Sequence, residues 1–230
     1  GLNMAFLPSG VMAYSHYIKD DLESMATILQ EQGYTPIAFH PGKASSWDRD
    51  KIYPNLGFET FYTVEDMDNP VYMRGAYVSD ASDYDFVMKL FEEKDPDEKL
   101  FLFNVTIQNH GGYMLDTVGM KEWVAMRGDY RKYNQAEQYL SLMRASDLAL
   151  KELITYFEQV DEPTMIVFFG DHQPNVETEF IEDLVGKPWT SFNMDEVQSR
   201  YTVPFFIWCN YDIEEAYYDS ISVNYLSTLA

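Results

Sequence analysis

The stretch Met165-Ile-Val-Phe-Phe-Gly-Asp-His172 decides the fold that this sequence predicts. Its first five residues are apolar, too few for a stable isolated helix, and their branched and aromatic side chains favour a buried strand. Asp171 and His172 follow almost directly. Ligands of open α/β sheets collect beyond the carboxyl ends of the strands, so this pair lies where a binding site is expected.

An acidic residue next to a histidine at such a position is typical of a metal site. Zn²⁺ and Mn²⁺ both accept a carboxylate oxygen and an imidazole nitrogen as ligands. The alternative interpretation is that Asp171 caps a turn and that His172 is an ordinary surface histidine. The pair by itself leaves both interpretations open.

Length and composition indicate a globular chain. With 230 residues, 46% of them apolar and 16% aromatic, it is long enough for one large domain with a substantial core. The sequence has no run of about 18 apolar residues, the length needed to span a bilayer. The single cysteine, Cys209, can form no internal disulfide and is expected to pack as a small apolar residue in a strand.

The charge excludes some classes of partner. With 38 acidic and 16 basic residues the formal charge is −22, which disfavours nucleic acid, because phosphate neutralisation needs clustered Lys and Arg. It also disfavours unaided adsorption to an anionic membrane. An anionic substrate remains possible, since surface charges are screened over about 8–10 Å.

Helical and strand patterns alternate along the chain. Apolar residues at helical spacing predict helices at 22–32, 50–56, 80–93 and 134–159. Short apolar runs predict further strands at 34–39, 58–62, 100–107 and 203–209, with 63–79 as a loop. The alternation predicts an α/β fold, a mostly parallel sheet flanked by helices on both faces.

The helix predicted at 134–159 carries a stripe of core-facing positions. They are 136, 140, 143, 147, 150, 154 and 157. All are apolar except Asp147. An unpaired buried charge is very costly, so Asp147 is expected to tie the helix to a backbone donor.

Three predicted strands are followed by residues that can bind a ligand or take part in catalysis. These residues are His40, His110 and Asp171, each at or just after the carboxyl end of its strand. We therefore expect the strands before His40, Asn109 and Gly170 to have neighbouring carboxyl ends and to form one shared site.

These loops resemble the lipoteichoic acid synthase family of the alkaline phosphatase and sulfatase superfamily. The matching segments are Gly170-Asp-His172, the loop from His40 through Trp47-Asp-Arg49 to Phe58, Asn109-His110, Val203–Trp208 and Ile221–Tyr225. The Trp-x-Arg loop is the discriminating motif. The resemblance implies an alkaline phosphatase/sulfatase-like α/β fold, incomplete at its N-terminal side, with residues 1–230 as a single partial catalytic domain.

The resemblance also assigns roles to residues. It implies that Asp171 and His172 are two ligands of a divalent metal, Mn²⁺ in the full-length enzyme. It implies that a pocket for glycerol phosphate is lined by His40, Trp47, Arg49 and His110. A guanidinium offers a planar fork to phosphate oxygens, and a histidine can donate to a charged or leaving oxygen.

Plainer interpretations of the loop stay open beside these roles. Trp47 could cover the helix that follows it. Arg49 could pair with Asp48 or Asp50 on the surface.

The family's threonine nucleophile, its glutamate metal ligand and its membrane helices lie upstream of the region that matches residue 1. Thr106 and Thr117 are poor substitutes, so no catalytic residue is assigned and the chain is expected to be an inactive C-terminal fragment that holds a metal weakly or not at all. Gly42 stands where family members often carry an acid, so the polar network of the pocket is expected to differ.

The expected function is that of a phosphoglycerol transferase. The full-length enzyme would move glycerol phosphate from phosphatidylglycerol to a cell-envelope polymer through a phosphothreonine. It would be tethered to the membrane at its extracellular face in a Gram-positive type bacterium. The alternatives are a sulfatase or phosphodiesterase hydrolase of the same superfamily and a non-catalytic binding domain; Cys209 lacks the Cys/Ser-x-Pro-x-Arg setting of sulfatases.

Overall fold

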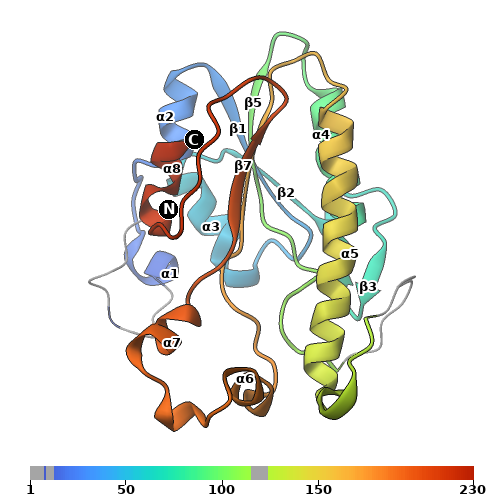
Figure 1. Cartoon of the computed structure of the whole chain (residues 1–230). Helices are drawn as coiled ribbons and strands as arrows, with labels where there is room; N and C mark the ends of the chain where they lie inside the picture. Colours follow the sequence, from blue (N-terminus) through green and yellow to red (C-terminus); the bar gives the residue numbers. More distant parts are fainter. Residues whose placement is uncertain (1–7, 9–12, 115–123) are drawn as a thin grey trace. The chain divides into compact units, whose positions relative to one another are not determined.

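The structure, a computed structural model, describes Pro8 and residues 13–114 and 124–230. The chain divides into two compact units; Figure 1 labels their helices and strands. The first unit comprises Gly1–Val71, Tyr77–Ile107 and Ile221–Ala230, and the second comprises Tyr72–Ala76 and Gln108–Ser220. The expectation of one partial catalytic domain over residues 1–230 stays a prediction.

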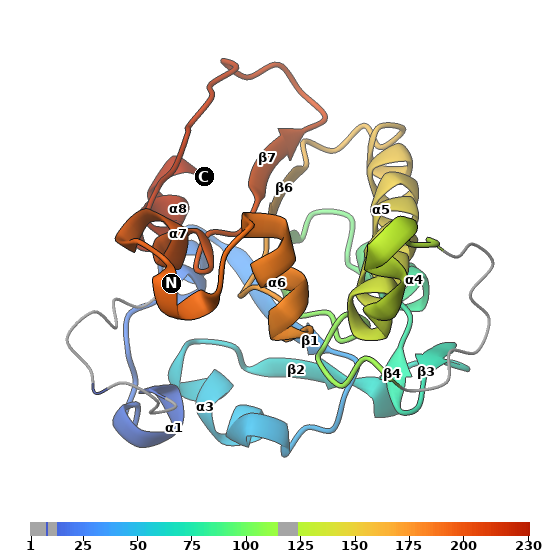
Figure 2. The same ribbon diagram turned by 60° about the horizontal axis from the view of Figure 1, so that its bottom comes forward.

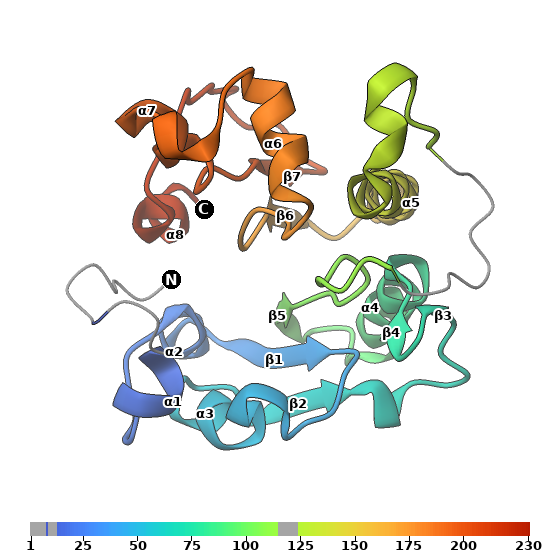
Figure 3. The same cartoon turned by 90° about the horizontal axis from the view of Figure 1, so that it is seen from below.

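The first unit is built on a three-stranded parallel sheet with the order β2-β1-β5. Its strands are β1 (Tyr34–His40), β2 (Thr60–Thr63) and β5 (Lys99–Asn104). Ile37 of β1 is opposite Thr60 of β2, and Figure 3 shows the two strands running in the same direction. The strand predicted at 34–39 is confirmed, whereas the strand predicted at 100–107 ends earlier, at Asn104.

Helices cover both faces of this sheet. Those of the first unit are α1 (Ala13–Tyr17), α2 (Met25–Glu31), α3 (Arg49–Asn55), α4 (Asp80–Glu93) and α8 (Leu226–Leu229). Ala38 and Phe39 are neighbours in β1, both fully buried, and successive strand residues point to opposite faces. Phe39 packs on Phe86 of α4, with ring centroids 4.7 Å apart. Ala38 packs in a cluster with Ala26 of α2 and Tyr53 of α3, which confirms the predicted parallel sheet between two layers of helices.

Side-chain caps explain where two of these helices begin. Helix α4 occupies the predicted residues 80–93, and the side chain of Ser79 caps its first turn. The start of α2 predicted at Leu22 is wrong, since the helix begins at Met25. Ser24 caps it, because its Oγ accepts a hydrogen bond from the backbone N–H of the second helical residue at 3.0 Å.

The second unit contains a long helix and a two-stranded sheet. Its elements are β3 (Tyr72–Arg74), η3 (Gly128–Lys132), α5 (Asn134–Phe157), β6 (Met165–Phe169), α6 (Thr178–Val185), η4 (Trp189–Ser191), α7 (Met194–Ser199) and β7 (Phe205–Cys209). Strands β6 and β7 are antiparallel, with Val167 opposite Ile207 (Figure 2). The strand predicted at 165–169 is confirmed, but it is only half-buried. Within the part of the chain that the structure describes, it pairs with β7 alone.

The buried face of α5 differs from the predicted stripe. Its buried residues are Ala136, Gln138, Ser141, Leu142, Ala149, Leu153 and Phe157. Met143 and Asp147 are exposed, so their predicted core positions are wrong. Apolar periodicity misleads here because polar residues also turn inward. Ser141 can do so because its Oγ donates to the carbonyl of Glu137 at 2.8 Å.

Other differences are small. The predicted loop at 63–79 contains η2 (Val64–Asp66), β3 and β4 (Tyr77–Val78), elements too short for a periodic pattern to reveal. Two more short 3-10 turns are η1 (Ser46–Asp48) and η5 (Val223–Tyr225). The elements predicted at 50–56, 58–62 and 203–209 form with shifted ends, as α3, β2 and β7.

Candidate active site

His40 ends the central strand β1 and is almost completely buried, with 2% of its surface exposed. Its Nδ1 lies 2.6 Å from the carbonyl oxygen of Val105, just beyond β5. With the proton on Nδ1, the ring donates to this carbonyl and Nε2 keeps its lone pair. The neighbouring strand therefore fixes the orientation of the imidazole.

Gly42 lies against this imidazole. A Cβ built at Gly42 would be 2.6 Å from Nε2 of His40 and 2.9 Å from its Cδ2. Any side chain at this position would therefore have to displace the ring. The observed orientation of the His40 ring therefore requires a residue without a side chain at position 42, where family members often carry an acid.

The turn that carries Trp47 and Arg49 has an unusual backbone. Trp47 (φ 62°, ψ 24°) and Asp48 (φ 53°, ψ 28°) are both in the left-handed region, which costs a non-glycine residue about 1–2 kcal/mol. Trp47 is 49% exposed, so burial of its indole offsets only part of this cost. Such strain is found most often at binding and catalytic sites.

Arg49 begins α3 directly after the strained turn. Its Nη1 donates to the carbonyl of Ser46 at 3.1 Å. Asp48 pairs with Lys51 at 2.7 Å, and Arg49 forms no ion pair with any residue that the structure describes. The alternative that Arg49 is tied up in a pair with Asp48 or Asp50 is therefore wrong for the described chain.

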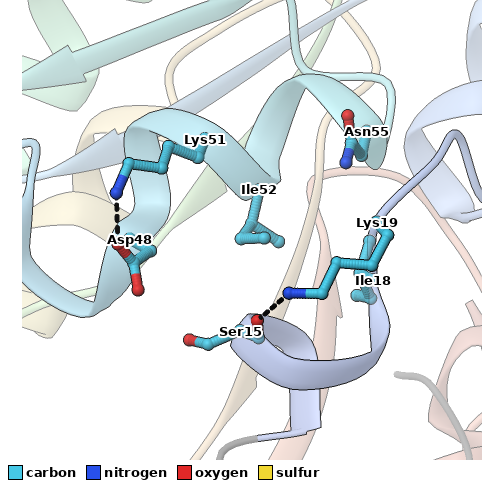
Figure 4. Close-up of a pocket in the computed structure, with 7 residues that line it drawn as sticks. All are labelled: Ser15, Ile18, Lys19, Asp48, Lys51, Ile52 and Asn55. Carbon is cyan, nitrogen blue, oxygen red and sulfur yellow. Dashed lines mark hydrogen bonds and ion pairs between the residues drawn. The ribbon is translucent and has the colours of Figure 1, made fainter.

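Asp48 also lines a hollow of about 360 Å³, which Figure 4 shows with its lining side chains. It is lined by Ser15, Ile18, Lys19, Asp48, Lys51, Ile52 and Asn55. Both ammonium groups in it already have oxygen partners, since Lys19 donates to the carbonyl of Ser15 at 2.6 Å and Lys51 pairs with Asp48. The hollow is therefore not arranged in advance for an anion.

His110 belongs to a loop that is held through its neighbours. Gln108 is buried, and its Nε2 donates to the carbonyl of Leu142 at 3.2 Å and to Oγ of Ser146 at 2.9 Å. Asn109 Nδ2 also donates to Oγ of Ser146, at 2.7 Å. His110 itself is an exposed residue of this anchored loop.

Arg74 is a residue that the sequence pattern missed. It ends β3 and is completely buried. Its guanidinium donates to the carbonyls of Gln108, His110 and Gly112. A lone arginine in a segment predicted as loop carries no recognisable signal, so only the structure reveals it.

Asp171 and His172 follow β6 and have exposed side chains. Oδ1 of Asp171 accepts the backbone N–H of His172 at 2.8 Å, as the turn-capping interpretation expects. Oδ2 remains beside Nε2 of His172, at 3.5 Å. The capping role and a ligand role are therefore compatible, because they use different oxygens.

The donor atoms of this pair fit a divalent metal. Nδ1 of His172 lies 2.9 Å from the carbonyl of Gln173, so a proton there leaves the Nε2 lone pair available. Ligands about 2.0–2.2 Å from a tetrahedral ion lie about 3.3–3.6 Å apart, which matches the observed separation. Among the described residues, no group of three His, Cys, Asp or Glu side chains could hold a metal, so a metal at this pair would need further ligands.

The predicted site residues divide between the two units. The first unit contains His40, Trp47 and Arg49, and the second contains His110, Asp171 and His172. That all six line one pocket stays a prediction. Thr106 follows the end of β5 and is not in a strand as expected, and Thr117 lies outside the described residues.

Comparison with known proteins identifies the class. The sulfatase family model matches residues 1–229, so the chain belongs to the sulfatase family. A Rhizobium meliloti protein named for modification of cyclic beta-1,2-glucan is 30% identical over 91% of this chain and 33% of its own length. Lipoteichoic acid synthase 1 of Bacillus subtilis is 26% identical over 81% of this chain and 29% of its own. The chain thus spans about a third of these relatives.

Solved structures agree with this assignment. The lipoteichoic acid synthase LtaP of Listeria monocytogenes superimposes with a TM-score of 0.70 at 23% identity, covering 86% of this chain and 48% of LtaP, and shows the fold. The Streptococcus pyogenes phosphoglycerol transferase GacH, solved with sn-glycerol-1-phosphate, gives 0.57 at 25% identity over 78% of this chain and 44% of GacH. The resemblance to lipoteichoic acid synthases is confirmed. No described helix is both long and apolar enough to cross a membrane.

Proposed function

We propose that the chain is part of a metal-dependent phosphoglycerol transferase of the cell envelope. The enzyme moves glycerol phosphate from phosphatidylglycerol to a polymer through a phosphothreonine, and a part of the protein beyond this sequence provides the threonine. It acts at the extracellular face of the membrane to which it is tethered. One observation carries the proposal: the guanidinium of Arg49 forms no ion pair with a described residue, although the chain contains 38 acidic residues.

Each candidate residue has a role that its surroundings permit. Arg49 binds two phosphoryl oxygens through its planar fork. His110 donates to charged or leaving oxygens, His40 does so through Nε2 when its ring carries a second proton, and the exposed indole of Trp47 covers the glycerol group.

Asp171 and His172 would hold the metal, Mn²⁺ by resemblance, with further ligands from the rest of the protein. When bound, the metal neutralises charge on the phosphoryl oxygens. Asp171 would hold the ion through Oδ2, because its Oδ1 accepts the backbone N–H of His172.

Replacing Arg49 tests the proposal. In the full-length enzyme, Arg49→Ala should lower turnover of a phosphatidylglycerol analogue roughly tenfold to a hundredfold, since a hydrogen bond to a charged group is worth about 1.5–3 kcal/mol. Arg127→Ala, at an exposed position of the second unit, is the matched control and should keep wild-type kinetics. Wild-type turnover in Arg49→Ala would contradict the proposal.

A hydrolase is the second candidate, because the matching family model is that of the sulfatases. A phosphodiesterase or sulfatase would release its product to water, whereas a transferase extends an acceptor. Product analysis with a polyglycerol phosphate acceptor and with a glucan acceptor distinguishes them, the glucan being suggested by the name of the Rhizobium relative. A non-catalytic binding domain would bind sn-glycerol-1-phosphate without turnover in the full-length protein.

A further inference from the structure

Arg74 is completely buried, and its guanidinium donates to the backbone of a single loop. Its Nε and Nη2 donate to the carbonyl of Gln108 at 3.3 and 3.2 Å, and its Nη1 donates to Gly112 at 2.9 Å. Nη2 also donates to the carbonyl of His110. A charged group is costly to bury unless its donors are satisfied, and here one five-residue loop supplies acceptors on three of its carbonyls.

Tyr113 completes this arrangement. The guanidinium carbon of Arg74 lies 5.3 Å from the centre of the Tyr113 ring, within range of a cation–π contact. The hydroxyl of Tyr113 donates to the carbonyl of Asn109 at 3.0 Å. Burial raises the pKa of Tyr113 to about 12, so the phenol keeps its proton at neutral pH and stays a donor.

The loop 108–112 is therefore fixed on two sides. Arg74 and Tyr113 hold the carbonyls of Gln108, Asn109, His110 and Gly112. Helix α5 holds the side chains of Gln108 and Asn109 through Ser146. His110, in contrast, is an exposed residue of the same loop, and none of these anchoring hydrogen bonds uses its imidazole.

We propose that Arg74 is a positioning residue for His110. It touches no substrate, because it is completely buried, and it acts by curling the loop so that the imidazole is held in one orientation. A lysine could keep the charge but could not reach three carbonyls at once, since it lacks the planar fork. The inference rests on the proposed function, in which His110 contacts the phosphoglycerol group.

A double-mutant cycle in the full-length enzyme tests this. We expect His110→Ala and Arg74→Met each to lower kcat/KM for a phosphatidylglycerol analogue about tenfold or more. If Arg74 acts through His110, kcat/KM of the double variant should be no more than about twofold below that of His110→Ala alone. Once the imidazole is absent, removing the residue that positions it can cost no further activity. Arg74→Lys should show an intermediate loss.

Tyr133→Phe is the matched control for general destabilisation. Tyr133 is buried in the same unit, and its hydroxyl bonds to the carbonyl of Glu179 at 3.0 Å and to the carboxylate of Asp183, both in α6 and neither in the loop 108–112. Its effect on kcat/KM should be small and should add to that of His110→Ala.

Each outcome decides between the two proposals. Wild-type kinetics in His110→Ala would overturn the proposed role of His110 itself. A loss in His110→Ala with additive losses in the double variant, or with wild-type kinetics in Arg74→Lys, would overturn the positioning role alone. If Arg74→Met fails to fold, the cycle is completed with Arg74→Lys, whose loss must likewise vanish in the His110→Ala background.

Discussion

The imidazole of His40 occupies the space that a side chain at Gly42 would fill: a Cβ there would lie 2.6 Å from Nε2. Real Cβ atoms do not come this close, so the ring would have to move. The ring is also held by the carbonyl of Val105 at 2.6 Å, and moving it would break this bond.

Gly42→Ala should therefore reduce activity through His40. The backbone of Gly42 is not left-handed, so alanine adds little backbone strain. We expect turnover of the full-length enzyme to fall about tenfold, the cost of a misplaced hydrogen-bonding group, with a small change in Tm. In a His40→Ala background the same substitution should have almost no further effect; an undiminished loss there would contradict the mechanism.

Metal binding by these 230 residues should be weak. Asp171 and His172 provide two donors, and transition-metal sites generally need three or four protein ligands. Calorimetric titration with Mn²⁺ should give a dissociation constant above about 1 μM. Sub-micromolar binding that is lost in His172→Ala would mean that the chain contains a ligand set beyond this pair.

Asp83 should make stability depend on pH. It is completely buried in α4, and its Oδ2 has no hydrogen-bond partner among the described residues. Burial raises its pKa well above the usual value, the charge of Asp80 raises it further, and a hydrogen bond from Asn104 lowers it. The folded state therefore binds the proton more tightly than the unfolded state. The resulting stabilisation is complete below about pH 4 and is lost as the pH rises toward the folded pKa.

Thermal unfolding of Asp83→Asn measures this effect. The amide cannot ionise, so the variant should be more stable than the wild type at pH 8 and should show a flatter dependence between pH 5 and pH 8. Asp85→Asn, exposed on the same helix, is the control and should leave the slope unchanged. Equal slopes in wild type and Asp83→Asn would contradict the prediction.

Gly57→Ala should destabilise the first unit by more than backbone strain alone. Gly57 has φ +88°, and a Cβ there would lie 2.7 Å from Cγ2 and 3.2 Å from the backbone nitrogen of Thr27. Left-handed strain costs about 1–2 kcal/mol, and the clash should add about 1–3 kcal/mol.

Gly33→Ala separates the two contributions. Gly33 has φ +85° but no atom within 4 Å of its Cβ position, so it should show the strain alone. Chemical denaturation measures both variants, and equal losses would show that Thr27 simply moves aside.

Elements with strong local signals could be predicted from the sequence. Helix α4 and strand β6 match their predicted residues, because a serine cap and an apolar run act within a few residues of chain. The Trp-x-Arg and Gly-Asp-His motifs identified the family for the same reason: motifs are short and contiguous. The α/β class followed from the alternation of such elements.

Burial and anchoring could not be predicted in this way. Position 147 of α5 was assigned to the core by apolar spacing, yet it is exposed, because Gln138 and Ser141 turn inward instead. A buried polar side chain needs hydrogen-bond partners that offset its loss of hydration. Those partners are brought together by tertiary folding, and residue spacing does not reveal them.

The sequence by itself determined the local elements, the family and the candidate residues. The tertiary structure decided how those residues are held. Arg74 and Gln108 are 34 residues apart, and His40 and Val105 are 65 apart. Hydrogen bonds between such distant positions leave no periodic trace in a sequence, because they form only when packing brings the two segments together.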